Sequence, residues 1–285
     1  METDRFTMRG NRSVSKSQES MMPTNRPVAL VTGASSGIGK ETALALVAAG
    51  FDVAGTSRDT SRVSPLDGVS FLDLDVASDA SVTTAVQQVI ERFGRIDVLV
   101  NNAGVGSMGA AEETSVAQAQ GVFDTNVFGV MRMVNEVLPH MRAQGRGRII
   151  NISSVLGFLP QPYMAVYAAS KHAIEGYTES WTTRSESTAS GRSSSNRLHQ
   201  DRIRGQQCET RHAPAGLRAA AADRRPRDGR GDQGRRRPTV VAKAIVAAAT
   251  DARPKLRYTA GPMAGRASTL RESLPPGPST SRSAR

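Results

Sequence analysis

Three side chains near the middle of the chain have the types and spacing for acid–base chemistry. Tyr167 and Lys171 are four residues apart, which on a helix places the phenol and the ammonium on one face. A cation there can lower the pKa of the phenol from its usual value of about 10, so that it becomes a general acid or base. A Tyr–Lys pair at this spacing is also commonplace on exposed helices. Ser154, at the end of a strand-like run, favours the catalytic interpretation, because its hydroxyl can hold a reacting oxygen beside Tyr167.

A glycine-rich turn nearer the start of the chain has the pattern of a dinucleotide-binding loop. It follows a short apolar run and opens a helical segment. Glycines there let the backbone approach a pyrophosphate, and the free N–H groups and dipole of the helix attract its charge. A glycine turn without a ligand is disfavoured, because strand, turn and helix all occur where the motif needs them. The predicted cofactor contacts in this turn are Gly33, Ser35, Ser36, Gly37, Ile38 and Gly39.

The end of the second strand-like run predicts which nicotinamide cofactor is bound. An acidic residue there would accept hydrogen bonds from the adenosine ribose, whereas this chain has Ser57 followed by Arg58. A guanidinium pairs with a 2′-phosphate that a carboxylate would repel, so NADP(H) is predicted rather than NAD. A solvated surface arginine is the alternative. A second basic residue inside the glycine turn is absent, because Ser36 has that place.

The elements that must position these residues alternate in pattern between residues 27 and 181. Short β-rich apolar runs alternate with longer segments of helical periodicity, which is typical of a parallel sheet with helices on both faces. The predicted fold is a single α/β domain with a Rossmann-like, doubly wound sheet. Strands are expected at 28–32, 52–56, 69–73, 98–101 and 148–152. Helices are expected near 40–49, 80–93, 117–143 and 168–181.

These motifs resemble the short-chain dehydrogenase/reductase family in order and spacing, over about residues 27–181. The resemblance also rests on the run Asn-Asn-Ala-Gly at 101–104 and on Asn126 within Asp-Thr-Asn-Val. It implies an oxidoreductase that transfers a hydride between NADP(H) and an alcohol or carbonyl substrate. The Tyr-Thr-Ala-Gly ending at 258–261 is similar to that of family members near the retinol and hydroxysteroid dehydrogenases.

The resemblance also implies a role for individual residues. Tyr167 exchanges a proton with the substrate oxygen, and Ser154 polarises that oxygen. Lys171 binds the nicotinamide ribose as well as tuning Tyr167, and Asn126 holds a water in a proton relay. The further cofactor contacts that it implies are Asp75, Val76, Asn102, Ala103 and Gly104. A helix-capping aspartate and a turn asparagine are the alternatives for Asp75 and Asn102.

A basic segment at residues 182–237 departs from this pattern. It carries 14 arginines, no lysine and 6 acidic residues, so it accounts for +8 of the net charge of +11. Because it also lacks aromatic residues, valine and methionine, we predict that it is disordered and replaces the sixth strand of the fold. An arginine-rich arm for nucleic acid and an inert insertion are two explanations. A reading-frame error is favoured, because a GC-rich gene read out of frame tends to encode Arg, Ala, Gly, Ser and Pro.

A missing sixth strand would leave an unpaired sheet edge beside the active site, so we expect poor folding and impaired activity. A helix over 239–250 and a last strand over 254–261 are expected within a remnant of the domain at 238–270. The domain proper is predicted at 27–181, and the ends at 1–26 and 271–285 are predicted to be disordered.

Other features narrow the function classes. Cys208 is the single cysteine, so no intrachain disulfide is predicted, and with no apolar run approaching 18 residues a cytoplasmic protein without a membrane span is expected. The four histidines lack metal-ligand spacing, so no metal is predicted. The expected partners are a small alcohol or carbonyl substrate and, from the resemblance, a second copy of the chain. The rival functions are a nucleic-acid binder, which is disfavoured, and a non-catalytic NADP-binding relic.

Overall fold

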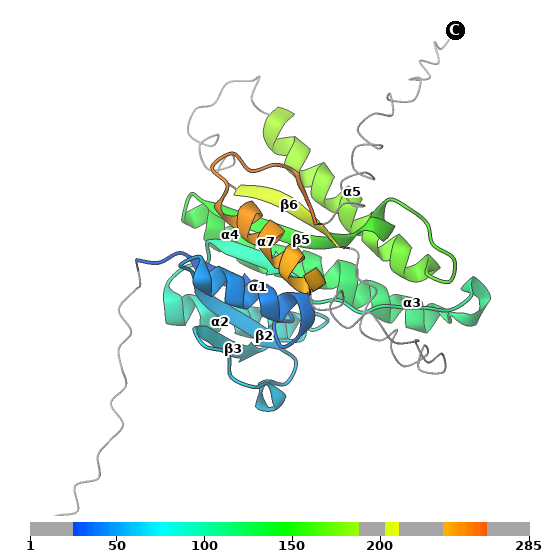
Figure 1. Ribbon diagram of the computed structural model, residues 1–285, viewed down its shortest axis with the longest axis horizontal. Coiled ribbons are helices and arrows are strands. Elements are labelled where there is room, and N and C mark those ends of the chain that lie inside the picture. Colours follow the sequence, from blue (N-terminus) through cyan, green and yellow to red (C-terminus); the bar gives the residue numbers. More distant parts are fainter. Residues whose placement is uncertain (1–24, 188–202, 211–235, 261–285) are drawn as a thin grey trace, which may run out of the picture.

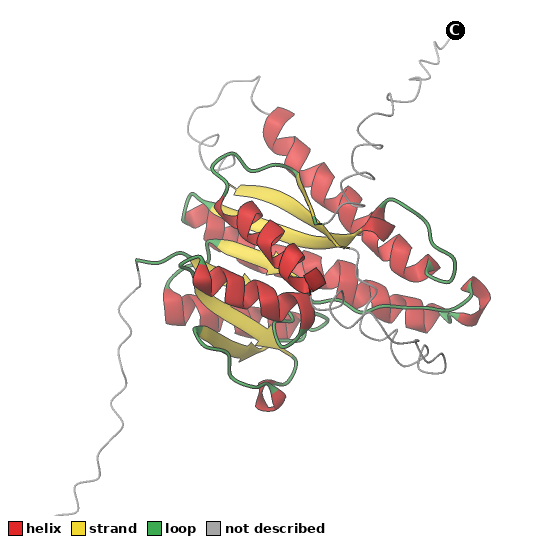
Figure 2. Cartoon of the chain, viewed as in Figure 1, coloured by secondary structure: helices red, strands yellow, loops and turns green. Residues whose placement is uncertain are grey.

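The computed structural model describes residues 25–187, 203–210 and 236–260, which form one parallel sheet between two layers of helices (Figure 1; Figure 2). The strand order is β3-β2-β1-β4-β5-β6-β7. This arrangement confirms the α/β, Rossmann-like fold class. The strands are β1 (Val28–Val31), β2 (Asp52–Ser57), β3 (Val69–Asp73), β4 (Val98–Asn101), β5 (Gly147–Ser154), β6 (Ile203–Thr210) and β7 (Arg257–Thr259).

The helices cover both faces of this sheet. The helices α2, α4 and α5 pack on one face, and α1 and α7 pack on the other, which is the near face in Figure 1. The helices are α1 (Gly37–Ala48), α2 (Asp79–Phe93), α3 (Val116–Phe123), α4 (Gly129–Ala143), α5 (Ala165–Ser187) and α7 (Arg236–Thr250). Four short turns complete the elements: η1 (Thr60–Arg62), η2 (Ala111–Glu113), η3 (Asp124–Phe128) and η4 (Val155–Gly157).

The apolar runs of the central strands explain why both faces are covered. Val28 and Leu30 of β1 belong to one core cluster, and Ala29 and Val31 belong to the other. Successive side chains of a strand point to opposite faces, so a continuous apolar run is stable only where helices bury both. The sheet extends from β1 toward β2 and β3 on one side and from β4 toward β5 on the other. In sheets of this type ligands bind at the carboxyl ends of the strands where the order reverses.

The prediction that the basic segment lacks the sixth strand is wrong for residues 203–210. Strand β6 pairs in parallel with β5 along its whole length, from Gly147↔Ile203 to Ser154↔Thr210, and with β7 from Gln207↔Arg257 to Glu209↔Thr259. Strand β5 is therefore not an edge strand. The composition concealed β6 because ladder hydrogen bonds come from the backbone, which any residue except proline supplies, and this run has no proline.

The other expected elements differ from the structure mainly at their ends. The single helix expected over 117–143 is divided into α3 and α4 by the π-helical turn η3. Helix α5 continues past residue 181 to Ser187. The predictions of disorder at 1–24, 188–202, 211–235 and 271–285 fall outside the described residues. Among the helices that are described, none combines the length and apolar character needed to cross a bilayer.

Candidate active site

The glycine turn between β1 and α1 has the geometry that its sequence predicts. Gly33 and Gly37 have φ values of 66° and 57°, in the left-handed region that glycine tolerates. A Cβ atom on Gly39 would lie 2.2 Å from the carbonyl oxygen of Gly33, so only glycine fits there. Ser36 precedes α1 and its side chain makes no capping hydrogen bond. The first turn of α1 therefore presents N–H groups that its own cap residue does not satisfy.

Asn102 and Ala103 brace this turn from the end of β4. The Asn102 amide donates to the carbonyl oxygens of Thr32 at 2.8 Å and Gly33 at 3.1 Å. The Thr32 hydroxyl oxygen accepts the backbone N–H groups of Asn102 and Ala103 at 3.0 and 2.9 Å. The structure thus brings two residues that the family resemblance singled out into contact with the turn. In the structure these two residues fix the backbone of the glycine turn.

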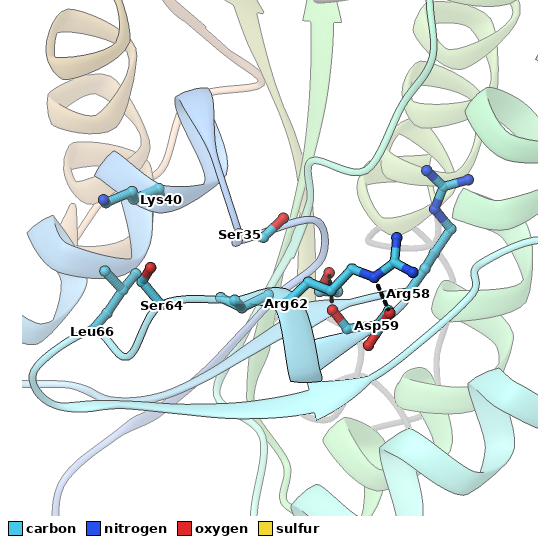
Figure 3. A pocket seen from close by; sticks show the side chains of 9 residues that line it. Ser35, Lys40, Arg58, Asp59, Arg62, Ser64 and Leu66 are labelled. Carbon is cyan, nitrogen blue, oxygen red and sulfur yellow. Dashed lines mark hydrogen bonds and ion pairs between the residues drawn. The ribbon is translucent and has the colours of Figure 1, made fainter.

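A cavity of about 620 Å³ lies beside the turn, at the ends of β1 and β2 (Figure 3). Three cationic side chains line it together with one carboxylate, Asp59, which pairs with Arg62 at 2.9 Å. Its lining consists of Ser35, Lys40, Ser57, Arg58, Asp59, Arg62, Val63, Ser64 and Leu66. Sequence reasoning identified Ser35 and Arg58 but missed Lys40 and Arg62. Lys40 directly follows Gly39, and the short helix η1 folds Arg62 back over the cavity.

Asp75 and Val76 follow β3 at the same edge of the sheet. The Asp75 carboxylate accepts the N–H group of Ala77 at 3.0 Å in the turn before α2, so the structure shows the local, turn-forming role for it. Val76 is 6% exposed and packs on α4, where a Cβ atom at Gly129 would lie 2.8 Å from its side chain. Neither residue lines the cavity beside the glycine turn.

At the other end of the region, Ser154, Tyr167 and Lys171 meet, as their spacing predicted. Ser154 ends β5, and its hydroxyl accepts the N–H group of Leu156 at 3.2 Å and lies close enough to the Tyr167 phenol of α5 to lower the pKa of that phenol. The Lys171 ammonium donates to the carbonyl oxygen of Ile152 at 2.8 Å and lies 5.8 Å from the centre of the Tyr167 ring. All three side chains are buried. A serine hydroxyl, a phenol and an ammonium are therefore assembled between β5 and α5.

The electrostatics of this group differ from the sequence-based expectation. Burial raises the pKa of Tyr167 above its usual value, and the neighbouring Ser154 hydroxyl opposes that rise. Burial also lowers the pKa of Lys171 to about 8, against the opposing charge of Glu175. The sequence predicted that the cation lowers the pKa of the phenol, whereas the structure raises it, because loss of hydration on burial is the largest cause.

Asn126 lies in the π-helical turn η3 and is buried. Its amide donates to the Val105 carbonyl at 2.9 Å and to the Ser170 hydroxyl at 3.1 Å, and its oxygen accepts the Val105 N–H group at 2.8 Å. The Ser170 hydroxyl donates in turn to the carbonyl oxygen of Tyr167 at 2.7 Å. Asn126 thereby connects the loop after β4 to the first turn of α5. Gly104 is part of the same contact, because a Cβ atom there would lie 3.2 Å from the Asn126 oxygen.

The chain is similar to curated oxidoreductases over about half of its length. It is 48% identical to the 3-ketodihydrosphingosine reductase of Bacteroides thetaiotaomicron over 152 residues, which cover 53% of this chain and 56% of that protein. It is 42% identical to retinol dehydrogenase 8 of Bos taurus over 163 residues, which cover 53% and 52%. The chain thus spans about half the length of the curated relatives it matches.

Solved structures with both nicotinamide cofactors are also similar. A metagenomic short-chain oxidoreductase in complex with NADP superimposes with a TM-score of 0.62 and 25% identity, over 82% of this chain and 96% of that one. A short-chain dehydrogenase/reductase of Burkholderia phymatum in complex with NAD gives 0.68 and 25%, over 88% and 95%. Residues 27–189, more than half of the chain, match the family described as short chain dehydrogenase. The protein therefore belongs to the short-chain dehydrogenase family.

Proposed function

We propose that this chain is an NADP(H)-dependent oxidoreductase that interconverts an alcohol and a carbonyl through Ser154, Tyr167 and Lys171. The observation that carries the proposal is that the Ser154 hydroxyl, the Tyr167 phenol and the Lys171 ammonium are buried together between β5 and α5. Hydroxyl, phenol and ammonium together can hold an oxygen and move one proton to or from it. The relatives named a reductase and a dehydrogenase support the same reaction class.

The residues that would hold the cofactor fit it sterically. Because Gly39 has no side chain, the start of α1 can pack directly against Gly33. The first turn of α1 can donate N–H groups to a pyrophosphate. Bound NADP(H) supplies or accepts the hydride. In the reducing direction, the Ser154 hydroxyl hydrogen-bonds the carbonyl oxygen and the Tyr167 phenol donates a proton to it. The Lys171 ammonium then stabilises the phenolate that remains, and the links from Asn126 through Ser170 keep this turn of α5 in place.

The cavity at the end of β2 supports NADP(H) over NAD. A phosphate monoester carries a charge of roughly −1.5 to −2 near neutral pH. The charges of Lys40, Arg58, Arg62 and Asp59 sum to +2, which matches that charge. Asp59 engages the Nε group of Arg62, so the other nitrogens of that guanidinium stay available to an anion (Figure 3). Solved relatives with either cofactor do not decide the preference, so the charge of this cavity is the argument for it.

A homo-oligomer, expected from the resemblance, is supported by two apolar side chains on the outer surface. Val116 at the start of α3 is 76% exposed and Phe128 in η3 is 48% exposed. Large apolar groups at such exposure gain free energy when a second copy covers them.

Tyr167→Phe tests the reaction. We expect the variant to lose at least about 100-fold in NADPH-coupled turnover of a panel of aliphatic, aromatic and long-chain ketones, because the phenylalanine has no proton to donate. The matched control is Tyr163→Phe, which changes a 65% exposed tyrosine four residues away. NADPH binding, measured by fluorescence, should persist in both variants. Turnover by Tyr167→Phe at the level of the control would contradict the proposed mechanism.

A further inference from the structure

A buried ion pair lies one helical turn beyond Lys171, on the side away from Tyr167. Tyr167, Lys171 and Glu175 follow one another at intervals of four residues on α5, so they share one face of the helix. Glu175 is 2% exposed, and its Oε2 atom pairs with the Arg257 guanidinium at 3.0 Å. A carboxylate this deeply buried is stable only with such partners.

Arg257 connects three parts of the molecule at this point. It belongs to β7 and its side chain is 13% exposed. It also pairs with Glu179, one turn farther along α5, and its guanidinium carbon lies 5.3 Å from the centre of the Phe158 ring. Phe158 follows η4, the turn that begins directly after Ser154. Arg257 thus ties the active-site helix to the last strand and to the loop after β5.

Gly157 of η4 lies against the Glu175 side chain. A Cβ atom on Gly157 would lie 3.0 Å from Cγ of Glu175 and 2.9 Å from the Ser153 hydroxyl oxygen. Without a side chain at this position, η4 lies directly against α5 and covers the Glu175 side chain. Charges enclosed in this way interact more strongly than charges in water, because the surroundings screen them less.

Lys171 needs a counter-charge to work as an ammonium in this setting. Burial alone favours the neutral amine, and it lowers the pKa of Lys171 to about 8 even though the negative charge of Glu175 acts in the opposite direction. A neutral amine at this position could not stabilise a phenolate on Tyr167. Among the described residues, Arg257 of β7 pairs with both Glu175 and Glu179 of α5, and Gly157 of η4 lies against Glu175 and the Ser153 hydroxyl of β5.

We propose that Glu175 is a positioning residue of the reaction: its carboxylate, held by Arg257, supplies the counter-charge that keeps the Lys171 side chain an ammonium ion beside Tyr167. This inference rests on the proposed function, because it assigns a role in the same proton transfer. It adds to the Ser–Tyr–Lys group a fourth residue that does not touch the substrate oxygen. Arg257 holds the Glu175 carboxylate in place by pairing with it. Its guanidinium also stacks on the Phe158 ring, so the loop after β5 contacts the same ion pair.

The direct test is the titration of Lys171 in the full chain without any ligand. The chain has five lysines, so labelling them with ¹³C at Cε gives few NMR signals, and Lys171→Met identifies the signal of Lys171. We compare Glu175→Gln with Glu179→Gln. Both substitutions remove one carboxylate that pairs with Arg257, but Glu179 lies two turns from Lys171.

Glu175→Gln should lower the midpoint of the Lys171 titration by at least about one pH unit, because an opposite charge at one-turn spacing is removed. Glu179→Gln should change it by less than about half a unit, because the interaction weakens with distance. The alkaline limb of the pH profile for carbonyl reduction should move down with the midpoint in Glu175→Gln. Equal midpoints in the two variants, or a wild-type midpoint in Glu175→Gln, would overturn the proposal.

A third variant keeps the test decisive if Glu175→Gln does not fold. Glu175→Asp keeps the negative charge but moves it one methylene farther from Lys171. It should therefore lower the Lys171 midpoint, by less than Glu175→Gln does. An unchanged or raised midpoint in Glu175→Asp would equally overturn the proposal. The titration does not depend on turnover, whereas the proposed function fails only if Tyr167→Phe stays active. The two failures can therefore be told apart.

Discussion

The two ends of the proposed cofactor region carry charges in opposite surroundings. At the adenosine end, the Arg62 side chain is 86% exposed and Arg58 also lies in solvent. At the catalytic end, Lys171 is 7% and Glu175 is 2% exposed. Exposed charges attract a ligand at little cost to the fold, and salt screens them. Buried charges shift one another's pKa values and reduce the stability of the fold unless they are paired.

Lys171→Met should show the largest effect of this difference. We expect at least a 100-fold loss of turnover, because no charge remains to stabilise a phenolate on Tyr167. The same variant should be more stable than the wild type by up to about 3 kcal/mol at pH 7, since it removes a cation whose pKa burial lowers from 10.5 to about 8. Turnover and denaturant unfolding measure the two effects. A variant that is both inactive and less stable would contradict this account of the buried cation.

Gly39→Ala should damage the adenosine end through the backbone rather than through charge. The added Cβ atom would lie 2.2 Å from the Gly33 carbonyl oxygen, so the turn must move and NADPH binding should be lost, together with a few kcal/mol of stability. Gly176→Ala is the matched control, because it changes an exposed glycine within α5 with nothing within 4 Å. It should stabilise the fold by about 0.5–1 kcal/mol. Thermal melts and NADPH fluorescence distinguish the two variants.

The stability of the wild-type protein should rise with pH between about 8 and 10.5. Lys171 is charged in both states below pH 8, so the cost of burying its charge is fully present there. Between the two pKa values the unfolded state binds the proton and the folded state does not, which favours the folded state as pH rises. The difference between wild type and Lys171→Met, measured by urea unfolding across this range, isolates this group. A constant difference would mean that the pKa of Lys171 is not lowered.

The central fold could be predicted because its information is local. The apolar runs of β1 to β5 and the glycine turn need only neighbouring residues to be recognised, and so do Tyr167 and Lys171, which share a helix turn. Strand β6 could not be predicted, because its backbone ladder with β5 has no signature in composition. The π-helical turn at Asn126 was missed because it lies within a continuous helical pattern.

The parts of the site that were missed depend on contacts between distant segments. Lys40 and Arg62 line the cavity because η1 returns the chain to α1. Glu175 stands at a visible four-residue interval from Lys171, but its partner Arg257 is 82 residues away and on the other side of the basic segment. Sequence spacing therefore located the proposed catalytic residues, while the residues that surround them could be identified only from the fold.

Arg58→Gln should give a moderate effect confined to the phosphate that distinguishes the cofactors. We expect about a tenfold loss of affinity for 2′,5′-ADP, because one charge-assisted contact is removed, and no change for 5′-AMP. Calorimetry with both nucleotides measures this directly. Arg92→Gln, which removes an exposed arginine of α2 outside the cavity, is the control. An equal loss for both nucleotides would place Arg58 elsewhere on the cofactor.

Lys40→Gln should give the smallest effect, and salt should reveal its origin. Lys40 lines the same cavity from α1 on a flexible side chain, so we expect a two- to threefold loss of 2′,5′-ADP affinity at low ionic strength. Raising the salt concentration to about 0.5 M should erase this difference, because the Debye length then falls below the size of the cavity. The Lys171 titration should hardly move under the same change, since its surroundings exclude ions. If the Lys171 midpoint changed with salt while the loss of 2′,5′-ADP affinity in Lys40→Gln did not, Lys171 would be the solvent-accessible charge and Lys40 the buried one, which would contradict this comparison.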